Sequence, residues 1–270
     1  MRRTSLVLLS VALAGLGQTA TAGPLRQPTA KWVVDYGDTS CTAVRAYGTQ
    51  EAPVTIAFRP SPTGAVVRLL VVRRGWVPEA RQFPVVTSIT PATAKMTGLR
   101  FATKDKKSNI VWINFDRPAL ERLGSAGEIA IKGDAIDERF ALPGIAAVLK
   151  ALDRCNEDLR TVWNVDEAAT VGLSKPATTL KSLHSYFSEN DYPAQAAREE
   201  ASGSTRFMLM IDETGKLKDC MVERTSGIAS LDAMSCGVLH ERAKFSPALD
   251  ASGKPTRSVV SNTIIWALED

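Results

Sequence analysis

The sequence contains few of the residues from which catalytic and metal sites are built. Only two of its 270 residues are histidine, His184 and His240, and they are far apart along the chain. The four cysteines form no C-x-x-C pair, so neither a zinc site nor a dithiol redox motif is predicted. A G-x-S-x-G nucleophile elbow and a phosphate-binding P-loop are also missing. We therefore expect no catalytic residues, no metal and no cofactor.

Long hydrophobic runs are missing as well, since no segment approaches the roughly 20 apolar residues that a membrane-spanning helix needs. The longest run, residues 6–16, follows two arginines and precedes an A-T-A sequence that ends at Ala22. This order is typical of a secretory signal peptide, here residues 1–22. We expect cleavage after Ala22 and an exported mature chain without a stable membrane span. The alternative is that the segment is kept as an uncleaved anchor.

The chain also lacks a strong excess of charge of one sign. The chain has 33 basic and 29 acidic residues, and its densest basic cluster is the sequence KDKK at residues 104–107. A nucleic-acid-binding surface would show a basic stripe with interleaved aromatic residues. This cluster stands where a turn is expected, so we predict a solvated loop and no nucleic-acid partner.

The cysteines that are present favour disulfides, because the chain is expected to be exported. Cys41 and Cys155 lie in the first half of the chain, and Cys220 and Cys236 lie in the second half. More than one pairing is open on spacing alone. If the two halves fold independently, pairing within each half is favoured.

The first half is predicted to be a β-rich domain, residues 23–165, whose function the sequence does not indicate. Short runs of β-branched and aromatic residues, among them residues 54–58 and 65–72, are separated by Pro, Gly or Lys/Asn-rich segments and predict strands. A helix is expected from near Pro143, with one buried apolar face that includes Cys155. Large aromatic residues usually pack in cores, and we expect this of Trp32, Trp76 and Trp112.

The second half has a regular order of elements. Residues 166–183 are rich in Asp, Ala, Thr, Ser, Pro and Gly and are interpreted as a short linker. After it, the patterns predict a short helix, two strands joined by a turn at Gly215, a second helix and a final strand, at residues 194–200, 204–212, 216–224, 230–243 and 256–268.

This order, with its residues, resembles the C-terminal domain of the TonB family over residues 184–270. The TonB family comprises the energy transducers that serve outer-membrane transporters. The residues that carry the resemblance are Tyr192-Pro193, Gly203, Asp212, Gly215, Val222, Ser226-Gly227, Leu231-Asp232, Phe245-Ser246-Pro247-Ala248 and Gly253-Lys254-Pro255. The resemblance implies an α+β protein in the periplasm, whose C-terminal α-β-β-α-β domain contains a three-stranded antiparallel sheet.

The resemblance also implies a binding site and a disulfide pattern. In the family, the last strand accepts an extended segment by strand addition, and the equivalent residues here are Val259, Ser261, Thr263, Ile265 and Ala267. The implied partner is an extended segment of an envelope protein, such as an outer-membrane transporter. The family plan places Cys220 on a strand and Cys236 on the helix above it, with Cys41 and Cys155 left to pair. These bridges would contribute about 3 and at most about 5 kcal/mol, respectively.

Two departures from the family limit what the resemblance implies. An energy transducer has an uncleaved membrane helix and a long Pro-rich spacer, whereas this chain has an expected cleavage site and a short linker. Participation in energy transduction is therefore not predicted. Two other functions stay open: an envelope enzyme with its site in the first domain, and a module that dimerises through its exposed edge strand.

Overall fold

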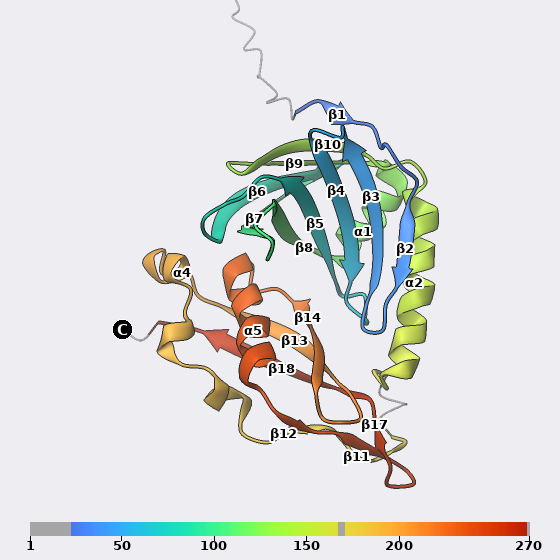
Figure 1. Cartoon of the computed structure of the whole chain (residues 1–270), viewed down its shortest axis with the longest axis vertical. Coiled ribbons are helices and arrows are strands. Elements are labelled where there is room, and N and C mark those ends of the chain that lie inside the picture. The colour runs from blue at the N-terminus through green and yellow to red at the C-terminus, as the bar shows by residue number, and fades with distance from the viewer. Residues whose placement is uncertain (1–22, 167–170, 269–270) are drawn as a thin grey trace, which may run out of the picture.

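The computed structural model describes residues 23–166 and 171–268. Its first domain, residues 23–166, contains a ten-stranded sheet with the strand order β1-β10-β9-β6-β7-β8-β5-β4-β3-β2 (Figure 1). All neighbouring strands are antiparallel except β1 and β10. The strands are β1 (Leu25–Arg26), β2 (Val33–Tyr36), β3 (Cys41–Gly48), β4 (Pro53–Pro60), β5 (Val66–Arg74), β6 (Arg81–Ile89), β7 (Ala92–Ala102), β8 (Ser108–Asp116), β9 (Glu128–Gly133) and β10 (Ile136–Ala141).

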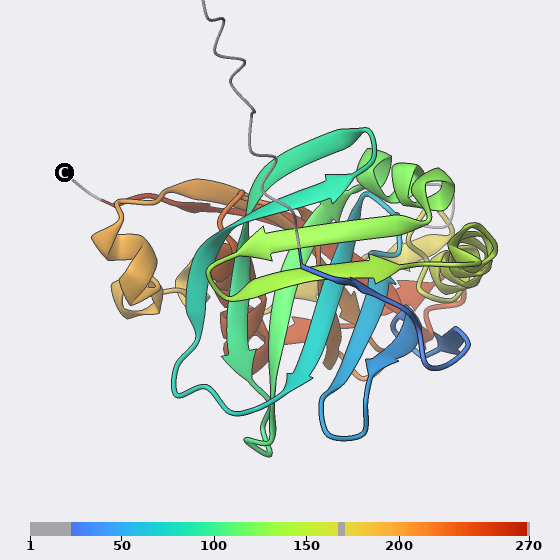
Figure 2. The same ribbon diagram turned by 90° about the horizontal axis from the view of Figure 1, so that it is seen from above.

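The sheet is strongly bent into a half-barrel, and two helices pack on its core (Figure 2). Helix α1 (Arg117–Ala126) begins after Asp116, whose carboxylate accepts a hydrogen bond from the amide of Ala119 at 2.9 Å. This is the N-cap that the Asp-Arg-Pro sequence indicates. Helix α2 (Ile145–Val162) buries the stripe that includes Cys155. The predicted β-rich architecture with a closing helix is confirmed.

The second domain, residues 171–268, is built on a three-stranded antiparallel sheet, β14-β13-β18. Helix α5 lies on one face of this sheet, and its core includes Phe207, Leu209, Leu231 and Trp266. The bounds are α4 (Ala194–Arg198), β13 (Gly203–Ile211), β14 (Leu217–Arg224), α5 (Ala229–Arg242) and β18 (Ser258–Trp266), preceded by two 3-10 helices at Leu183–Tyr186 and Glu189–Asp191. The α+β class and the three-stranded sheet are thus confirmed.

The turn between β13 and β14 depends on a glycine. Gly215 has φ +81, and a Cβ there would lie 2.5 Å from the carbonyl oxygen of Phe245. A side chain would therefore meet both backbone strain and a backbone clash. This explains why the turn between the two predicted strands has glycine at position 215.

The segment interpreted as a linker contributes strands to the second domain. Its strands β11 (Leu173–Lys175) and β12 (Thr178–Thr179) pair with β16 (Ala248–Asp250) and β15 (Phe245–Ser246), and β16 also pairs with β17 (Pro255–Thr256). Residues 171–179 are therefore attached to the second domain by backbone hydrogen bonds.

The three tryptophans of the first domain lie in different environments. Trp112 is buried and Trp32 is partly buried against the first core. Trp76 is 54% exposed, so the expectation that it packs in the core is wrong. It lies in the loop before β6, next to the buried Val77. The pattern of β-branched and aromatic residues that predicts strands does not distinguish an aromatic residue in a loop from one in a strand.

The two domains share an extensive interface. Leu99 and Trp112 of the first domain form a buried cluster with Ala229 of α5, and Met210 of β13 belongs to the core of the first domain. The face of the C-terminal sheet opposite α5 is thus partly covered by the first domain. This explains why Met208, Met210 and Met221 are almost fully buried although they alternate with the residues that face α5.

The first domain also caps helix α5. The residue at its N-cap is Ile228, which offers no side-chain acceptor. Instead, Thr97 Oγ1 accepts a hydrogen bond from the amide of Ala229 at 2.9 Å, and Gln82 Oε1 accepts one from the amide of Ser230 at 3.0 Å. Free amides at a helix start need acceptors, and here they come from residues more than a hundred positions away.

Candidate functional site

Strand β18 is one edge of the C-terminal sheet. It pairs with β13 along its whole length, from Ser258 opposite Ile211 to Trp266 opposite Gly203. On its other side it pairs with no strand in the part of the chain that the structure describes. Its outer backbone groups are therefore positioned to pair with an incoming strand.

One hydrogen bond shows which residues of β18 direct their backbone outward. The amide of Thr263 donates to the side-chain oxygen of its neighbour Asn262 at 2.7 Å. In an antiparallel pair, residues alternate between bonding the partner strand and facing away from it. Because Thr263 bonds a local side chain, we assign it to the outward set, together with Ser261 and Ile265 two residues to either side.

The side chains of β18 divide in the same way. Ile264 and Trp266 are buried against α5, and the indole Nε1 of Trp266 donates to Ser235 Oγ at 2.9 Å. On the opposite face Ser261 is exposed, and Ile265 is 70% exposed. Ile264 and Trp266 therefore fix the strand on the face that packs against α5, and Ser261 and Ile265 are exposed on the other face.

The predicted binding residues lie in three different situations. Ser261, Thr263 and Ile265 lie on the middle and end of β18, which pairs with β13 on one side and with no strand of the described residues on the other. Val259 is partly buried against the core of the first domain, and Ala267 is exposed and follows the last residue of the strand. The role of all five in binding stays a prediction.

The other edge strand, β14, is engaged by the first domain. Asp219 accepts a hydrogen bond from Thr39 Oγ1 at 2.8 Å and forms an ion pair with Arg59. Glu223 accepts a hydrogen bond from Thr63, and burial raises the pKa of this carboxyl group. These contacts place the β2–β3 loop, the end of β4 and the β4–β5 loop of the first domain against β14.

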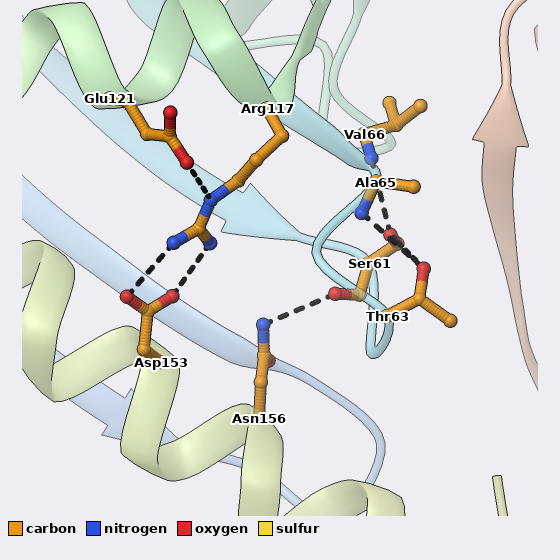
Figure 3. Close-up of polar contacts among 8 residues, drawn as sticks. All are labelled: Ser61, Thr63, Ala65, Val66, Arg117, Glu121, Asp153 and Asn156. Atoms are coloured by element: carbon orange, nitrogen blue, oxygen red, sulfur yellow. Dashed lines mark hydrogen bonds and ion pairs between the residues drawn. The ribbon is translucent and has the colours of Figure 1, made fainter. Parts of the chain in front are cut away.

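The loop that contacts β14 is itself fixed in place (Figure 3). Its residue Ser61 accepts a hydrogen bond at the backbone oxygen from Asn156 of α2 at 3.1 Å. Helix α2 is in turn linked to α1, because Arg117 forms a bidentate ion pair with Asp153 at 2.7 and 3.1 Å. The first domain thus contacts the side chains of β14 through a braced loop, and β18 is the edge strand for which no such loop contact is seen among the described residues.

Comparison with known families identifies the domain that contains this edge. Residues 188–268 match the family model described as Gram-negative bacterial TonB protein C-terminal. The second domain is a TonB-like domain. No curated protein and no solved structure matches the chain. The match covers α4, the three-stranded sheet and α5 and leaves the first domain without a family. It indicates a TonB-like protein-binding module of an envelope-associated family.

A buried carboxylate organises the TonB-like domain, and the sequence pattern showed only part of its role. Asp232 lies in the first turn of α5 and is fully buried. It accepts hydrogen bonds from Ser226 N at 2.8 Å, Ser226 Oγ at 2.9 Å and Thr205 Oγ1 at 2.9 Å, and also from Thr225 Oγ1. Asn114 of the first domain donates to it at 3.1 Å. It therefore joins β13, the β14–α5 turn and the first domain.

Near this carboxylate, the first domain contributes a stacked arginine. Arg68 lies over the ring of Trp112, with its guanidinium carbon 4.0 Å from the ring centroid. Burial lowers the pKa of Arg68 to about 10, and the nearby Arg59 contributes to this shift, while Asp219 and Asp232 act against it. The guanidinium remains charged at neutral pH and complements the two acids of the TonB-like domain across the interface.

All four cysteines form disulfides within their own domains. Cys41 is bonded to Cys155 and Cys220 to Cys236, with Cα–Cα distances of 6.0 and 5.5 Å. The two pairs that the family plan implies are thus present, and they fit an exported protein. Among the described residues there is no group of three or more His, Cys, Asp or Glu side chains arranged to hold a metal. The described helices include none long and apolar enough to cross a membrane.

Proposed function

We propose that this protein binds an extended segment of an envelope protein, such as the N-terminal peptide of an outer-membrane transporter, by strand addition to β18. The observation that carries the proposal is the contrast between the two edges of the sheet. The first domain engages β14 through Thr39, Arg59 and Thr63, whereas the outer side of β18, away from β13, pairs with no strand of the described residues.

We also propose that the protein acts in the periplasm by binding, without catalysis. The core of the first domain is filled by buried apolar side chains from both helices and most of its strands. This is the expected interior of a structural domain, and it favours a binding protein over an envelope enzyme. The first domain then serves to cap α5, to cover Met210 and to leave one edge of the sheet open.

The test is a titration of the full mature chain with N-terminal peptides of outer-membrane transporters from the same cell, followed by backbone-amide NMR. The isolated TonB-like domain is unsuitable, because it would expose Met208, Met210 and Met221 and lose the cap of α5. Saturable shifts concentrated on residues 259–267 would support strand addition. Shifts elsewhere, or none at millimolar peptide with both disulfides intact, would refute it.

Dimerisation through β18 is distinguished from peptide binding with the same samples. Two copies that pair through their β18 edges would also change the amides of residues 259–267, but without peptide and in a concentration-dependent manner. Sedimentation velocity over a hundredfold range of protein concentration, roughly, separates the two. A monomer throughout this range leaves peptide addition as the explanation of any shifts.

Asn262→Ala is expected to tighten peptide binding by roughly fivefold, because a competing hydrogen bond of about 1 kcal/mol is removed. In the parent protein, the amide of Thr263 donates to the Asn262 side chain, and an incoming peptide must break this bond to pair with that amide. In the alanine variant there is no such bond to break. Isothermal titration calorimetry with the peptide measures the change. Asn262→Asp keeps the acceptor oxygen and serves as the matched control, for which no tightening is expected. Equal affinities for the alanine variant and the parent would contradict the assignment of Thr263 as outward-facing.

A further inference from the structure

Three loops of the first domain meet at one end of its sheet (Figure 2). Arg74, the last residue of β5, lies opposite Ser108, the first residue of β8. Its guanidinium donates a hydrogen bond to the carbonyl oxygen of Glu51 in the β3–β4 loop at 3.4 Å. The β3–β4, β5–β6 and β7–β8 loops therefore form one surface, which we call the loop surface: residues 49–52, 75–80 and 103–107. It belongs wholly to the first domain, and the proposed strand addition does not use it.

The loop surface exposes one large aromatic side chain. Trp76 is 54% exposed, although the next residue, Val77, is buried. The turn before it is fixed, because Gly75 donates from its amide to the carbonyl oxygen of Lys107 at 3.0 Å and accepts from Asn109 Nδ2 at 2.9 Å. Gly75 has φ +112, a conformation that residues with a side chain rarely adopt. The chain thus presents Trp76 to solvent from a defined turn.

The two segments that meet at Gly75 carry basic side chains. Four of these side chains are exposed and form no ion pair within residues 23–166 and 171–268: Arg74, Lys104, Lys106 and Lys107. The acid between the lysines, Asp105, is engaged by its own turn. It accepts hydrogen bonds from Thr103 Oγ1 and from the amide of Lys107, and these bonds lower the pKa of its carboxyl group. It offsets one of the four positive charges, so the residues next to Trp76 have a positive balance.

The other charged residues at this end of the sheet nearly cancel one another. Glu79 of the β5–β6 loop is followed by Arg81 at the start of β6, and Glu51 lies in the β3–β4 loop. Asp134 of the β9–β10 turn and Arg100 of β7 line the same cleft as Arg81. The excess of positive charge is therefore concentrated on the β7–β8 loop, beside the turn that carries Trp76.

A single tryptophan beside several cations fits the surface of an anionic lipid bilayer. Tryptophan is enriched at the level of the lipid headgroups, because its ring is apolar and its N–H is polar. Each lysine or arginine near an anionic bilayer strengthens binding by roughly fivefold. A protein partner would require a larger apolar patch, with several anchoring side chains packed together. The loop surface offers Trp76 alone as a large apolar anchor.

We propose that the loop surface docks on an anionic phospholipid bilayer, with the ring of Trp76 among the headgroups and the lysines of residues 104–107 against the lipid phosphates. The contact is peripheral, because the loop backbone is polar and only side chains enter the headgroup layer. Each interaction is weak, so binding is reversible and decreases as salt is added. This docking is independent of peptide binding at β18.

Vesicle co-sedimentation of the full mature chain tests the proposal, with vesicles of phosphatidylcholine alone and of phosphatidylcholine mixed with phosphatidylglycerol. We expect binding to the mixed vesicles, binding to the neutral vesicles that is weaker by roughly tenfold or more, and a loss of binding at high salt. Trp76→Ser is expected to weaken binding to the mixed vesicles by roughly tenfold. Lys104→Gln combined with Lys107→Gln is expected to weaken it by roughly twentyfold. These side chains are exposed, so the thermal midpoint should stay that of the parent.

Each variant has a matched control outside the loop surface. Tyr36 of β2 is 57% exposed, so Tyr36→Ser removes a comparable aromatic side chain. Lys150→Gln combined with Lys181→Gln removes the same charge from two other exposed positions. Both controls should bind the mixed vesicles as the parent does.

Tryptophan emission assigns the contact to Trp76. Mixed vesicles are expected to shift the emission of the parent to shorter wavelength and to leave the emission of Trp76→Ser unchanged. The proposal is overturned if the mixed vesicles are not bound, if neutral vesicles are bound as tightly, or if Trp76→Ser and the double lysine variant both bind as the parent does. Failure to bind either kind of vesicle would instead favour a protein partner for the loop surface.

Discussion

Thr263→Pro is expected to weaken peptide binding by roughly 100-fold, because an incoming strand loses one main-chain donor and meets the proline ring. The amide of Thr263 bonds the side chain of Asn262 and is not needed by β13. Proline is tolerated on edge strands where the missing amide faces outward. The thermal midpoint should therefore fall by less than about 3 °C. Calorimetric titration with the peptide and thermal unfolding of the same sample measure both effects.

Ile264→Pro is the matched control for this variant. Ile264 is the neighbouring residue, is buried against α5, and lies opposite Thr205 of β13. Proline there removes a bond of the inner ladder, so a loss of about 3 kcal/mol in the free energy of unfolding is expected. A Thr263→Pro protein that binds peptide as the parent does would refute strand addition at β18. A Thr263→Pro protein that is as unstable as Ile264→Pro would refute the outward assignment of Thr263.

Asp232→Ala is expected to lower the free energy of unfolding by about 3–5 kcal/mol. The carboxylate accepts hydrogen bonds from Thr205, Thr225 and Ser226 of its own domain and from Asn114 of the first domain. Alanine leaves these donors buried without an acceptor, and removing one partner of a buried network costs the desolvation of the groups left behind. Urea unfolding with the disulfides intact measures the change.

Two variants make this second test specific. Asp232→Asn keeps one acceptor oxygen and should lose about half as much stability. Asp158→Ala removes an exposed acid from α2 and should change the free energy of unfolding by less than about 0.5 kcal/mol. If Asp232→Ala also changes the free energy of unfolding by less than about 0.5 kcal/mol, the carboxylate does not organise the domain as its hydrogen bonds indicate.

Local patterns of residues were sufficient to predict the two helices and the three long strands of the TonB-like domain, but not the short strands β11, β12, β15, β16 and β17. The alternating residues of β13 and β18, the turn at Gly215 and the apolar stripe of α5 each depend on neighbours a few positions away, and all three are present. The same is true of the capped start of α1 at Asp116. The disulfide pairs followed from the expectation of export, the division of the chain and the family plan together.

The candidate site was predicted only in part. The sequence and the family plan indicated that the last strand is an edge, but alternation with a period of two also allowed β14 to be the open one. The choice depends on Thr39, Arg59 and Thr63, which contact Asp219 and Glu223 from positions 160 and 180 residues away. No local pattern contains such contacts.

The sequence by itself therefore determined the order of the two helices and three long strands of the TonB-like domain and the strand-rich character of the first domain, because these depend on short-range periodicity and turn chemistry. Only the tertiary structure decided that α5 is capped by Thr97 and Gln82 of the other domain, that Met210 is covered, and that the first domain contacts the side chains of the edge strand β14. The physical reason is that exposure and hydrogen-bond satisfaction belong to the packed surfaces of two domains, whose contacting residues are far apart along the chain.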